Sequence, residues 1–287
     1  MFTQLLTIEH RKLTGRALLW VELAILALLV FALHAAILAV LQQPQPDLPP
    51  QAQAELRASL RWPQGLLNAL TFANGGELGG LFAVVLAAAV VAQEYTWRTV
   101  HLWLSRGVPR GAYLGAKFGA LAGALLLLVL TALLAGGAAT GFYTWRAQGA
   151  LPWSDLPWSD LLRGVLATWV TLLPYAAGTL AVAVISRSTL TATGVGLGYN
   201  LLVENLAVQV LLLASPDLAR WARYLPGMAA KAALSFLQGG LDVQVGMNGG
   251  PAAGLLEPGP ALLLLLAYTA AGLALAWWAF RRQDIAG

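Results

Sequence analysis

The sequence predicts an all-α integral membrane protein, and both its composition and its apolar segments support this fold class. Of its 287 residues, 59% are hydrophobic and only 10% are charged, and the mean hydropathy is +0.70. Soluble domains carry about 25% charged residues, so this composition is typical of a chain that lies mostly in lipid. Six apolar segments are long enough for a helix to cross a bilayer, which needs roughly 17–25 residues.

We expect a single transmembrane domain over residues 1–287, with six spans joined by polar segments. The second span is the least apolar, because Glu77 and several glycines shorten its apolar part and lower its helix propensity. The expected spans are residues 18–41, 76–92, 112–140, 164–185, 189–214 and 260–280.

The distribution of Lys and Arg predicts that both ends of the chain lie in the cytoplasm. With the N-terminus inside, the cytoplasmic pieces are residues 1–17, 93–111, 186–188 and 281–287. Basic residues are about three times denser in these pieces than in the outer ones, as the positive-inside rule requires. We therefore expect a multi-pass protein of the cell (cytoplasmic) membrane, N-in and C-in. Anionic lipid headgroups account for the net charge of +4 better than nucleic acid does.

The chain carries no recognisable catalytic or metal site. It has no cysteine, so disulfides, thiol catalysis and Cys-based zinc sites are excluded. Its histidines, His10, His34 and His101, lie on separate segments without the His-x-x-x-His spacing of a zinc site. No Gly-x-Ser-x-Gly elbow is present, and Phe118 follows Lys117 where a phosphate-binding loop needs a hydroxyl. We expect this chain to be no enzyme by itself and to bind neither a cofactor nor a metal.

Residues 1–16 predict an amphipathic helix lying on the cytoplasmic leaflet before the first span. One helical face collects the apolar residues Phe2, Leu5, Leu6 and Leu13. Glu9 lies on this apolar side, three residues before Lys12, and can pair with it. A simple basic flank for the first span explains the positive charge of this segment equally well.

A stripe of small residues marks the third span. Gly111, Gly115, Gly119 and Gly123 recur every four residues, which is the spacing for close contact between membrane helices. Packing within one subunit is the simpler interpretation, and a dimer interface is the alternative.

The polar segment between the second and third spans, residues 93–117, is the most informative part of the sequence. Its first half predicts one short amphipathic helix over 94–106, in which Glu94 and Arg98 are spaced for an ion pair. Gly107 then ends this helix. A short amphipathic helix between two spans has no obvious task unless another protein docks on it.

This segment resembles the coupling segment of the permease subunits of ABC type-2 transporters. In that family a Glu, a Thr soon after it, a leucine-rich turn, a Gly-Val/Ile-Ser-Arg-like turn and a Lys recur between the second and third spans. Two positions depart from the pattern, because Arg98 stands where a Gly often precedes the Thr and Pro109 stands where a Ser is common. The resemblance implies that an ATPase subunit couples to Glu94, Tyr95, Arg98, Thr99, Leu102, Trp103, Leu104, Arg106, Arg110 and Lys117.

The resemblance extends to other parts of the chain. These permeases often begin with a Glu-x-x-Lys elbow helix, which Glu9 and Lys12 would supply. They also carry short outer helices before the last span, here within 215–259. The run GLGYNLLVEN in the fifth span is similar to their Gly-x-x-Tyr and Val-Glu stretch.

Polar groups inside a span are costly and usually functional. The fifth span offers four of them for a translocation path, Tyr199, Asn200, Glu204 and Asn205. The alternative is that a protonated or hydrogen-bonded Glu204 only holds helices together.

The resemblance implies the function of a permease subunit, most simply an exporter, that moves a substrate across the membrane. Two copies of this chain, or this chain and a related one, would pair with two ATPase subunits that hold the ATP and Mg²⁺. The sequence does not identify the substrate. A non-transporting membrane scaffold without an ATPase is the alternative. An intramembrane hydrolase or transferase is disfavoured because no paired catalytic groups lie at one depth.

Overall fold

The computed structural model describes residues 1–43, 49–97, 99–208, 210, 221–238 and 255–283. Within these residues every regular element is a helix, so the expected all-α fold is confirmed. In the described part of the chain, five helices are long and apolar enough to cross a membrane, and they coincide with five of the six predicted spans. They are α2 (Ala17–Gln42), α5 (Leu78–Thr96), α7 (Arg110–Gln148), α8 (Trp158–Ser186) and α13 (Pro258–Arg282).

The predicted span at 189–214 has a different character. Its first part is α9 (Thr189–Gly198), which continues directly into a π-helix, η2 (Tyr199–Ala207). Neither helix alone has the length of a span, and residues 209 and 211–214 lie outside the described part of the chain. The span predicted over 189–214 therefore stays a prediction.

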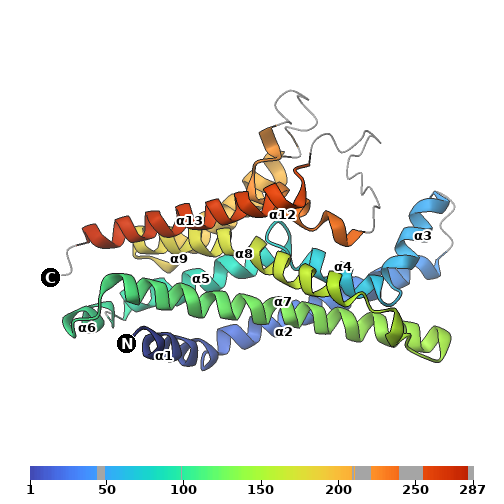
Figure 1. Ribbon diagram of the computed structural model, residues 1–287, viewed down its shortest axis with the longest axis horizontal. Coiled ribbons are helices and arrows are strands. Elements are labelled where there is room, and N and C mark those ends of the chain that lie inside the picture. The colour runs from blue at the N-terminus through green and yellow to red at the C-terminus, as the bar shows by residue number, and fades with distance from the viewer. Residues whose placement is uncertain (44–48, 98, 209, 211–220, 239–254, 284–287) are drawn as a thin grey trace.

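Two long helices organise the fold. α7 runs along most of the length of the molecule and packs against α1 (Phe2–Thr14), α2 and α4 (Gln64–Phe72) (Figure 1). α8 packs against α5, α9 and α13. The leucines at the centre of these contacts have no exposed surface, and they include Leu121, Leu125, Leu128, Leu172 and Leu180. The core thus lies around α7 and α8.

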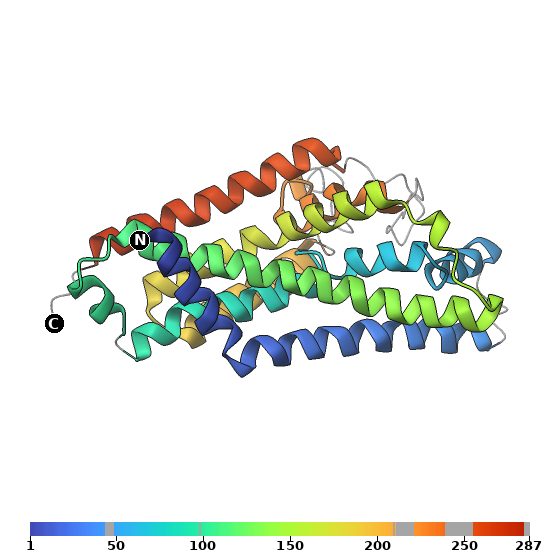
Figure 2. The same cartoon turned by 60° about the horizontal axis from the view of Figure 1, so that its bottom comes forward.

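Three of the four glycines of the stripe on α7, Gly115, Gly119 and Gly123, face α1, which crosses over α7 in Figure 2, whereas Gly111 faces Trp277 of α13. A methyl group added at Gly119 would lie 3.0 Å from Leu6 Cδ1, and one at Gly115 would lie 3.4 Å from Phe2 Cε2. The absent side chains therefore let the two helices approach closely. This stripe is a packing surface within one chain, as the simpler interpretation of the sequence expected.

The expected outer segment 42–75 is more ordered than a loop. It contains α3 (Pro50–Ser59) and α4, and α4 lies end to end with α5 along α7 (Figure 2). Leu66, Leu67 and Leu70 of α4 are buried. With nine residues, α4 is too short to be recognised as a span, and the Asn-Gly-Gly run at 74–76 separates it from α5. α4 therefore belongs to the core, although the sequence analysis did not predict it as a helix.

The remaining helices are short. α6 (Thr99–Ser105) lies between α5 and α7, and α12 (Pro226–Ala233) and η3 (Ser235–Gln238) precede α13. A single turn, η1 (Trp153–Asp155), precedes α8. Helices therefore do occur before the last span, where the sequence predicted them. The side of the membrane on which they lie remains a prediction.

Candidate functional site

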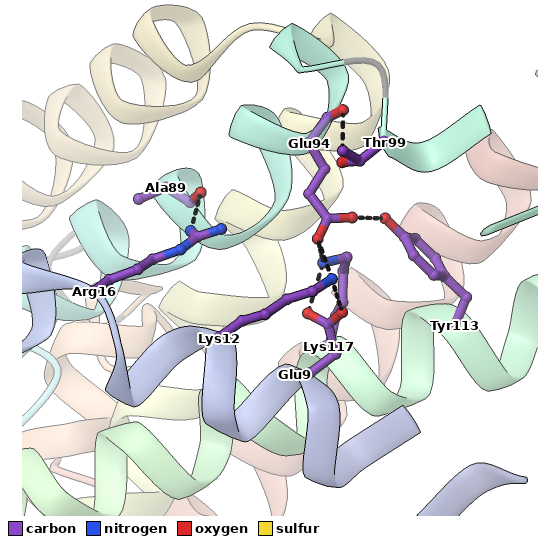
Figure 3. Close-up of polar contacts among 8 residues, drawn as sticks. All are labelled: Glu9, Lys12, Arg16, Ala89, Glu94, Thr99, Tyr113 and Lys117. Carbon is purple, nitrogen blue, oxygen red and sulfur yellow. Dashed lines mark hydrogen bonds and ion pairs between the residues drawn. The ribbon is translucent and has the colours of Figure 1, made fainter. Parts of the chain in front are cut away.

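Four charged side chains from three helices meet where α1, the end of α5 and the beginning of α7 come together (Figure 3). We call Glu9, Lys12, Glu94 and Lys117 the charge cluster. Leu5, Glu9 and Leu13 are all buried and lie on one face of α1 at intervals of four. Glu9 is therefore carried into the protein by the same apolar face that packs α1 against α7.

The four groups alternate in sign and contact one another directly. Lys117 Nζ lies 2.8 Å from Glu9 Oε2 and 2.8 Å from Glu94 Oε1. Lys12 Nζ lies 2.8 Å from Glu9 Oε1 and 3.1 Å from Glu94 Oε1. Each carboxylate thus contacts two ammonium groups, and each ammonium contacts two carboxylates. The cluster carries no net charge.

Burial makes this neutrality essential. The side chain of Lys117 is 0% exposed, that of Glu94 is 2% exposed and that of Glu9 is 8% exposed. An isolated charge at such depth is strongly unfavourable, so each group depends on the others for its charged state. Lys12 is the most exposed member. Burial alone would lower the pKa of Lys12, but its hydrogen bond to Glu9 and the charge of Glu94 raise that pKa above its usual value of 10.5.

Neighbouring side chains fix Glu94 further. The hydroxyl of Tyr113 donates a hydrogen bond to Glu94 Oε2, and the ring of Tyr113 stacks on Phe280 at the end of α13. The hydroxyl of Thr99 donates to the backbone carbonyl of Glu94 over 3.4 Å. These contacts connect the cluster to α13 on one side and to α6 on the other.

The end of α13 also binds two residues of the predicted coupling set. Arg110 donates hydrogen bonds to the carbonyl oxygens of Phe280, Arg281 and Gln283. The hydroxyl of Tyr95 donates to Gln283 Oε1 over 3.0 Å. Carbonyls in the last turn of a helix have no partner within the helix, so Arg110 completes their hydrogen bonding.

The expectation of one helix over 94–106 was wrong. α5 ends at Thr96, Trp97 forms a turn, and α6 begins at Thr99. The turn allows Glu94 of α5 and Val100 of α6 to be buried at the same time, which the structure shows for both. Arg98 lies outside the described residues. Within the described residues, Glu94 forms ion pairs with Lys12 and Lys117, which lie on other helices.

A groove lies beside the cluster and has a volume of about 510 Å³. We call it the α6 groove. It is lined by Lys12, Arg16, Glu94, Trp97, Thr99, Leu102, Trp103 and Arg106. Trp97 is 60% exposed and Leu102 is 59% exposed, so the groove combines open apolar surface with basic side chains. Lys12 lies 4.7 Å from the ring centroid of Trp103, a cation–π contact that joins α6 to the cluster.

A second buried polar site lies between η2, α8 and α12, and we call it the Glu204 site. One oxygen of Glu204 accepts a hydrogen bond from the Tyr175 hydroxyl, and the other accepts from the Gly227 N–H over 3.0 Å. Gly227 belongs to the first turn of α12, where free N–H groups and the helix dipole favour a carboxylate. Both oxygens of Glu204 are therefore used as acceptors.

The break between α4 and α5 borders this region. Asn200 Nδ2 donates to the carbonyl of Gly75 over 3.2 Å, and the N–H of Gly75 donates to Thr171 Oγ1 over 2.9 Å. Asn205 Nδ2 donates to the carbonyl of Asn200 over 2.9 Å. The side chains of Asn200 and Thr171 thus provide hydrogen-bond partners for the backbone of Gly75, which lies in the break between α4 and α5.

The structure therefore brings together some of the residues predicted for a translocation path and adds others. Asn200 and Glu204 are buried, whereas Tyr199 is 36% exposed. Tyr175 and Gly227 were not predicted for the site. Pro174 inside α8 and the Gly-rich break before α5 were signals of irregular backbone that could have indicated this region. Among the described residues, no group of three or more His, Cys, Asp or Glu could hold a metal ion.

Comparison with protein families gives a match over most of the chain. A family model described as "Protein of unknown function (DUF2705)" matches residues 67–286. No curated protein matches the chain. The matched range includes Glu94, Lys117 and the Glu204 site, and it begins after α1.

Proposed function

The chain belongs to the family of proteins of unknown function DUF2705, and from the geometry of its two polar sites we propose that it is the permease subunit of an ABC type-2 transporter. In this proposal it exports a substrate across the cytoplasmic membrane, driven by ATP hydrolysis in a separate ATPase subunit. The observation that carries the proposal is the connection between the α6 groove and the charge cluster.

Force applied to α6 would reach three other helices through short polar contacts. Thr99 of α6 is bonded to the end of α5 at Glu94, and Trp103 contacts Lys12 of α1. Glu94 in turn is paired with Lys117 of α7. These contacts join a small surface helix to α1, α5 and α7, which is the mechanical requirement for coupling a docked ATPase to membrane helices.

The surface of the α6 groove supports the docking of another protein. Exposed Trp97 and Leu102 supply apolar area, and Arg16 and Arg106 supply positive charge at its edge. Aromatic residues and arginine are the types that most often dominate protein interfaces. Glu94 is buried, so in this proposal it transmits the docking force and does not contact the ATPase itself.

The same proposal includes six spans with both ends in the cytoplasm, α1 as the elbow helix and α6 as the coupling helix. Lys12 supports the elbow assignment, because it pairs with Glu9 within α1 and also with Glu94 of α5, next to the segment that would receive the ATPase. Two copies of the chain, or a related pair, would work with two ATPase subunits that bind ATP and Mg²⁺.

The Glu204 site supports a translocation path. Transporters frequently place polar side chains beside interrupted helices within the membrane, where free backbone groups can face a substrate. Here the break between α4 and α5 lies against Asn200, and η2 is a π-helix, a form that is rare and frequent at functional sites. A scaffold protein without transport has no need of such a site.

The test is to search the genes adjacent to this one for an ATPase with Walker motifs and to reconstitute the chain with that ATPase. The pair should co-purify, and the permease should stimulate ATP hydrolysis. Leu102→Asp and Arg106→Glu, both in the α6 groove, should abolish stimulation without lowering the yield of membrane-inserted protein. Arg146→Glu, an exposed change near the C-terminal end of α7, is the matched control and should leave stimulation unchanged. Full stimulation by both groove variants would refute docking at α6, and the absence of any associating ATPase would favour the scaffold alternative.

A further inference from the structure

A second groove lies where α8 and α13 begin, and it has a volume of about 490 Å³, within the range of ligand pockets. Leu166 and Val170 of α8, Leu262 of α13 and Phe236 of η3 contribute apolar walls. Arg163, Leu166 and Val170 recur at helical spacing along one face of α8. The apolar side of the groove therefore runs along α8 and α13, two of the candidate membrane spans.

Two opposite charges lie on the same groove. Asp160 and Arg163 are one turn apart on α8, and both line it. Neither side chain forms an ion pair or a hydrogen bond, with one another or with any other part of the chain that the structure describes. Asp160 lies in the first turn of α8, where the helix dipole stabilises a carboxylate. Both charges are thus available to a ligand.

The surroundings indicate the depth of the groove in a membrane. Trp153 and Trp158, close to the beginning of α8, are 62% and 68% exposed. Exposed tryptophans at the ends of spans are typical of the boundary between lipid headgroups and acyl chains. Asp160 and Arg163 are close to these tryptophans and therefore lie at the depth of the headgroups. Leu166 and Val170 lie further along α8, and Leu262 lies one turn into α13, so these three side chains lie at the depth of the acyl chains.

We propose that this groove binds one molecule of phosphatidylethanolamine. The lipid phosphate lies at the guanidinium of Arg163, the primary ammonium lies at the carboxylate of Asp160, and one acyl chain follows Leu166 and Val170. A guanidinium is the preferred partner of a phosphate, and a primary ammonium donates hydrogen bonds to a carboxylate.

The charge pattern selects against other common phospholipids. An anionic headgroup such as phosphatidylglycerol places its phosphate beside Arg163 but offers nothing to neutralise Asp160. Phosphatidylcholine has a positive charge, yet its quaternary ammonium has no N–H to donate to Asp160. Of these three lipids, only phosphatidylethanolamine has both a phosphate for Arg163 and a primary ammonium for Asp160.

The test is native mass spectrometry of the full chain, purified in detergent and offered equal amounts of the three lipids with identical acyl chains. Phosphatidylethanolamine should be retained preferentially. Arg163→Gln should weaken its retention by about tenfold, the usual consequence of losing one charge-assisted hydrogen bond. Asp160→Asn should remove the preference for ethanolamine over choline. Val170→Trp, which fills the apolar channel, should reduce retention of every lipid at this site.

Arg146→Gln is the control, because Arg146 is exposed and lies outside the groove. Thermal unfolding of each variant establishes that it is folded. Equal retention of the three lipids, or retention that none of the groove variants changes, would overturn the proposal. No ATPase takes part in this measurement, so its result is independent of the proposed transport function.

Discussion

The ammonium of Lys117 lies 2.8 Å from a carboxylate oxygen of Glu94, and the Lys117 side chain has no exposed surface. This pair joins the end of α5 to the first turns of α7. Glu9 adds α1 to it, with its own oxygen 2.8 Å from the same ammonium. One buried cation thus fastens three helices at one end of the protein.

The first prediction concerns the stability that this cation provides. Lys117→Met keeps the length of the side chain but leaves Glu9 and Glu94 with Lys12 as their one remaining cation. Removing one partner of a buried ion pair costs about 3–5 kcal/mol, so we expect a loss of that size in the free energy of unfolding. Chemical or thermal unfolding in detergent measures it.

The matched control is Lys231→Met. Lys231 also pairs with a glutamate, Glu77, at 3.0 Å, but the two side chains are 44% and 41% exposed. Exposed pairs contribute at most about 1 kcal/mol. If Lys117→Met destabilises the protein no more than Lys231→Met, the charge cluster does not have the structural role assigned to it.

The second prediction is a pH dependence that arises from Lys12. Its pKa is raised in the folded protein, so its contribution to stability is fully present below the unfolded value of about 10.5 and is lost as pH rises through the folded pKa. The difference in unfolding midpoint between the wild type and Lys12→Met should be constant from pH 7 to about pH 10 and should shrink above that. A difference that instead grows at alkaline pH would contradict the assigned contacts.

The sequence predicted the part of this site that depends on local spacing. Glu9 and Lys12 are three residues apart on one helix, and they pair as expected. The partner expected for Glu94 by the same logic, Arg98, lies outside the described residues, and the partners that the structure does describe are Lys12 and Lys117. Helical spacing identifies which residues can meet on one helix. It does not show that Glu94 lies on the buried face of α5 and contacts side chains of α1 and α7.

The same limit applies to the fold. Long apolar runs predicted α2, α5, α7, α8 and α13, because the thickness of a bilayer fixes a minimum length. α4 has nine residues and becomes stable only by packing against α7 and α8, so no local pattern marks it. The Glu204 site was found in part, since a carboxylate in an apolar run is conspicuous. Its donors Tyr175 and Gly227 come from other helices.

The third prediction concerns Glu204. Both of its oxygens accept hydrogen bonds, whereas a glutamine has one acceptor oxygen and must turn its NH₂ group toward Tyr175 or Gly227. Glu204→Gln should therefore destabilise the protein by about 1–3 kcal/mol. Tyr175→Phe, which removes one donor and leaves the bond from Gly227, should cost less.

Transport distinguishes the two roles considered for Glu204. If the residue lines a path, Glu204→Gln should reduce transport far more than Tyr175→Phe does after both are compared at equal amounts of folded protein. A Glu204→Gln variant with normal transport and a lowered melting temperature would establish that the carboxylate only holds helices together.

The fourth prediction concerns Glu22 of α2, whose side chain is buried and has no hydrogen-bond partner among the residues that the structure describes. The residue is 4% exposed, and neither of its carboxylate oxygens has a hydrogen-bond partner in the described ranges. Burying such a group is unfavourable, so Glu22→Leu should raise the free energy of unfolding by about 1–3 kcal/mol. Glu22→Gln retains an unpartnered polar group and should gain less. A loss of stability in Glu22→Leu would mean that the carboxylate has a partner of its own.

The last prediction tests the orientation on which the docking of an ATPase depends. The α6 groove must face the cytoplasm, and the beginning of α8 must face outward. The chain contains no cysteine, so single cysteines can be introduced without background labelling. Ser105 at the end of α6 and Ser159 in the first turn of α8 are both exposed and are suitable positions. A membrane-impermeant maleimide should label Ser159→Cys in intact cells and Ser105→Cys only after permeabilisation. Because α5 alone separates the α6 groove from the preceding outer segment, a failure of α5 to cross would place α6 outside. Labelling of Ser105→Cys in intact cells would therefore refute the permease proposal, since a cytoplasmic ATPase could not reach α6.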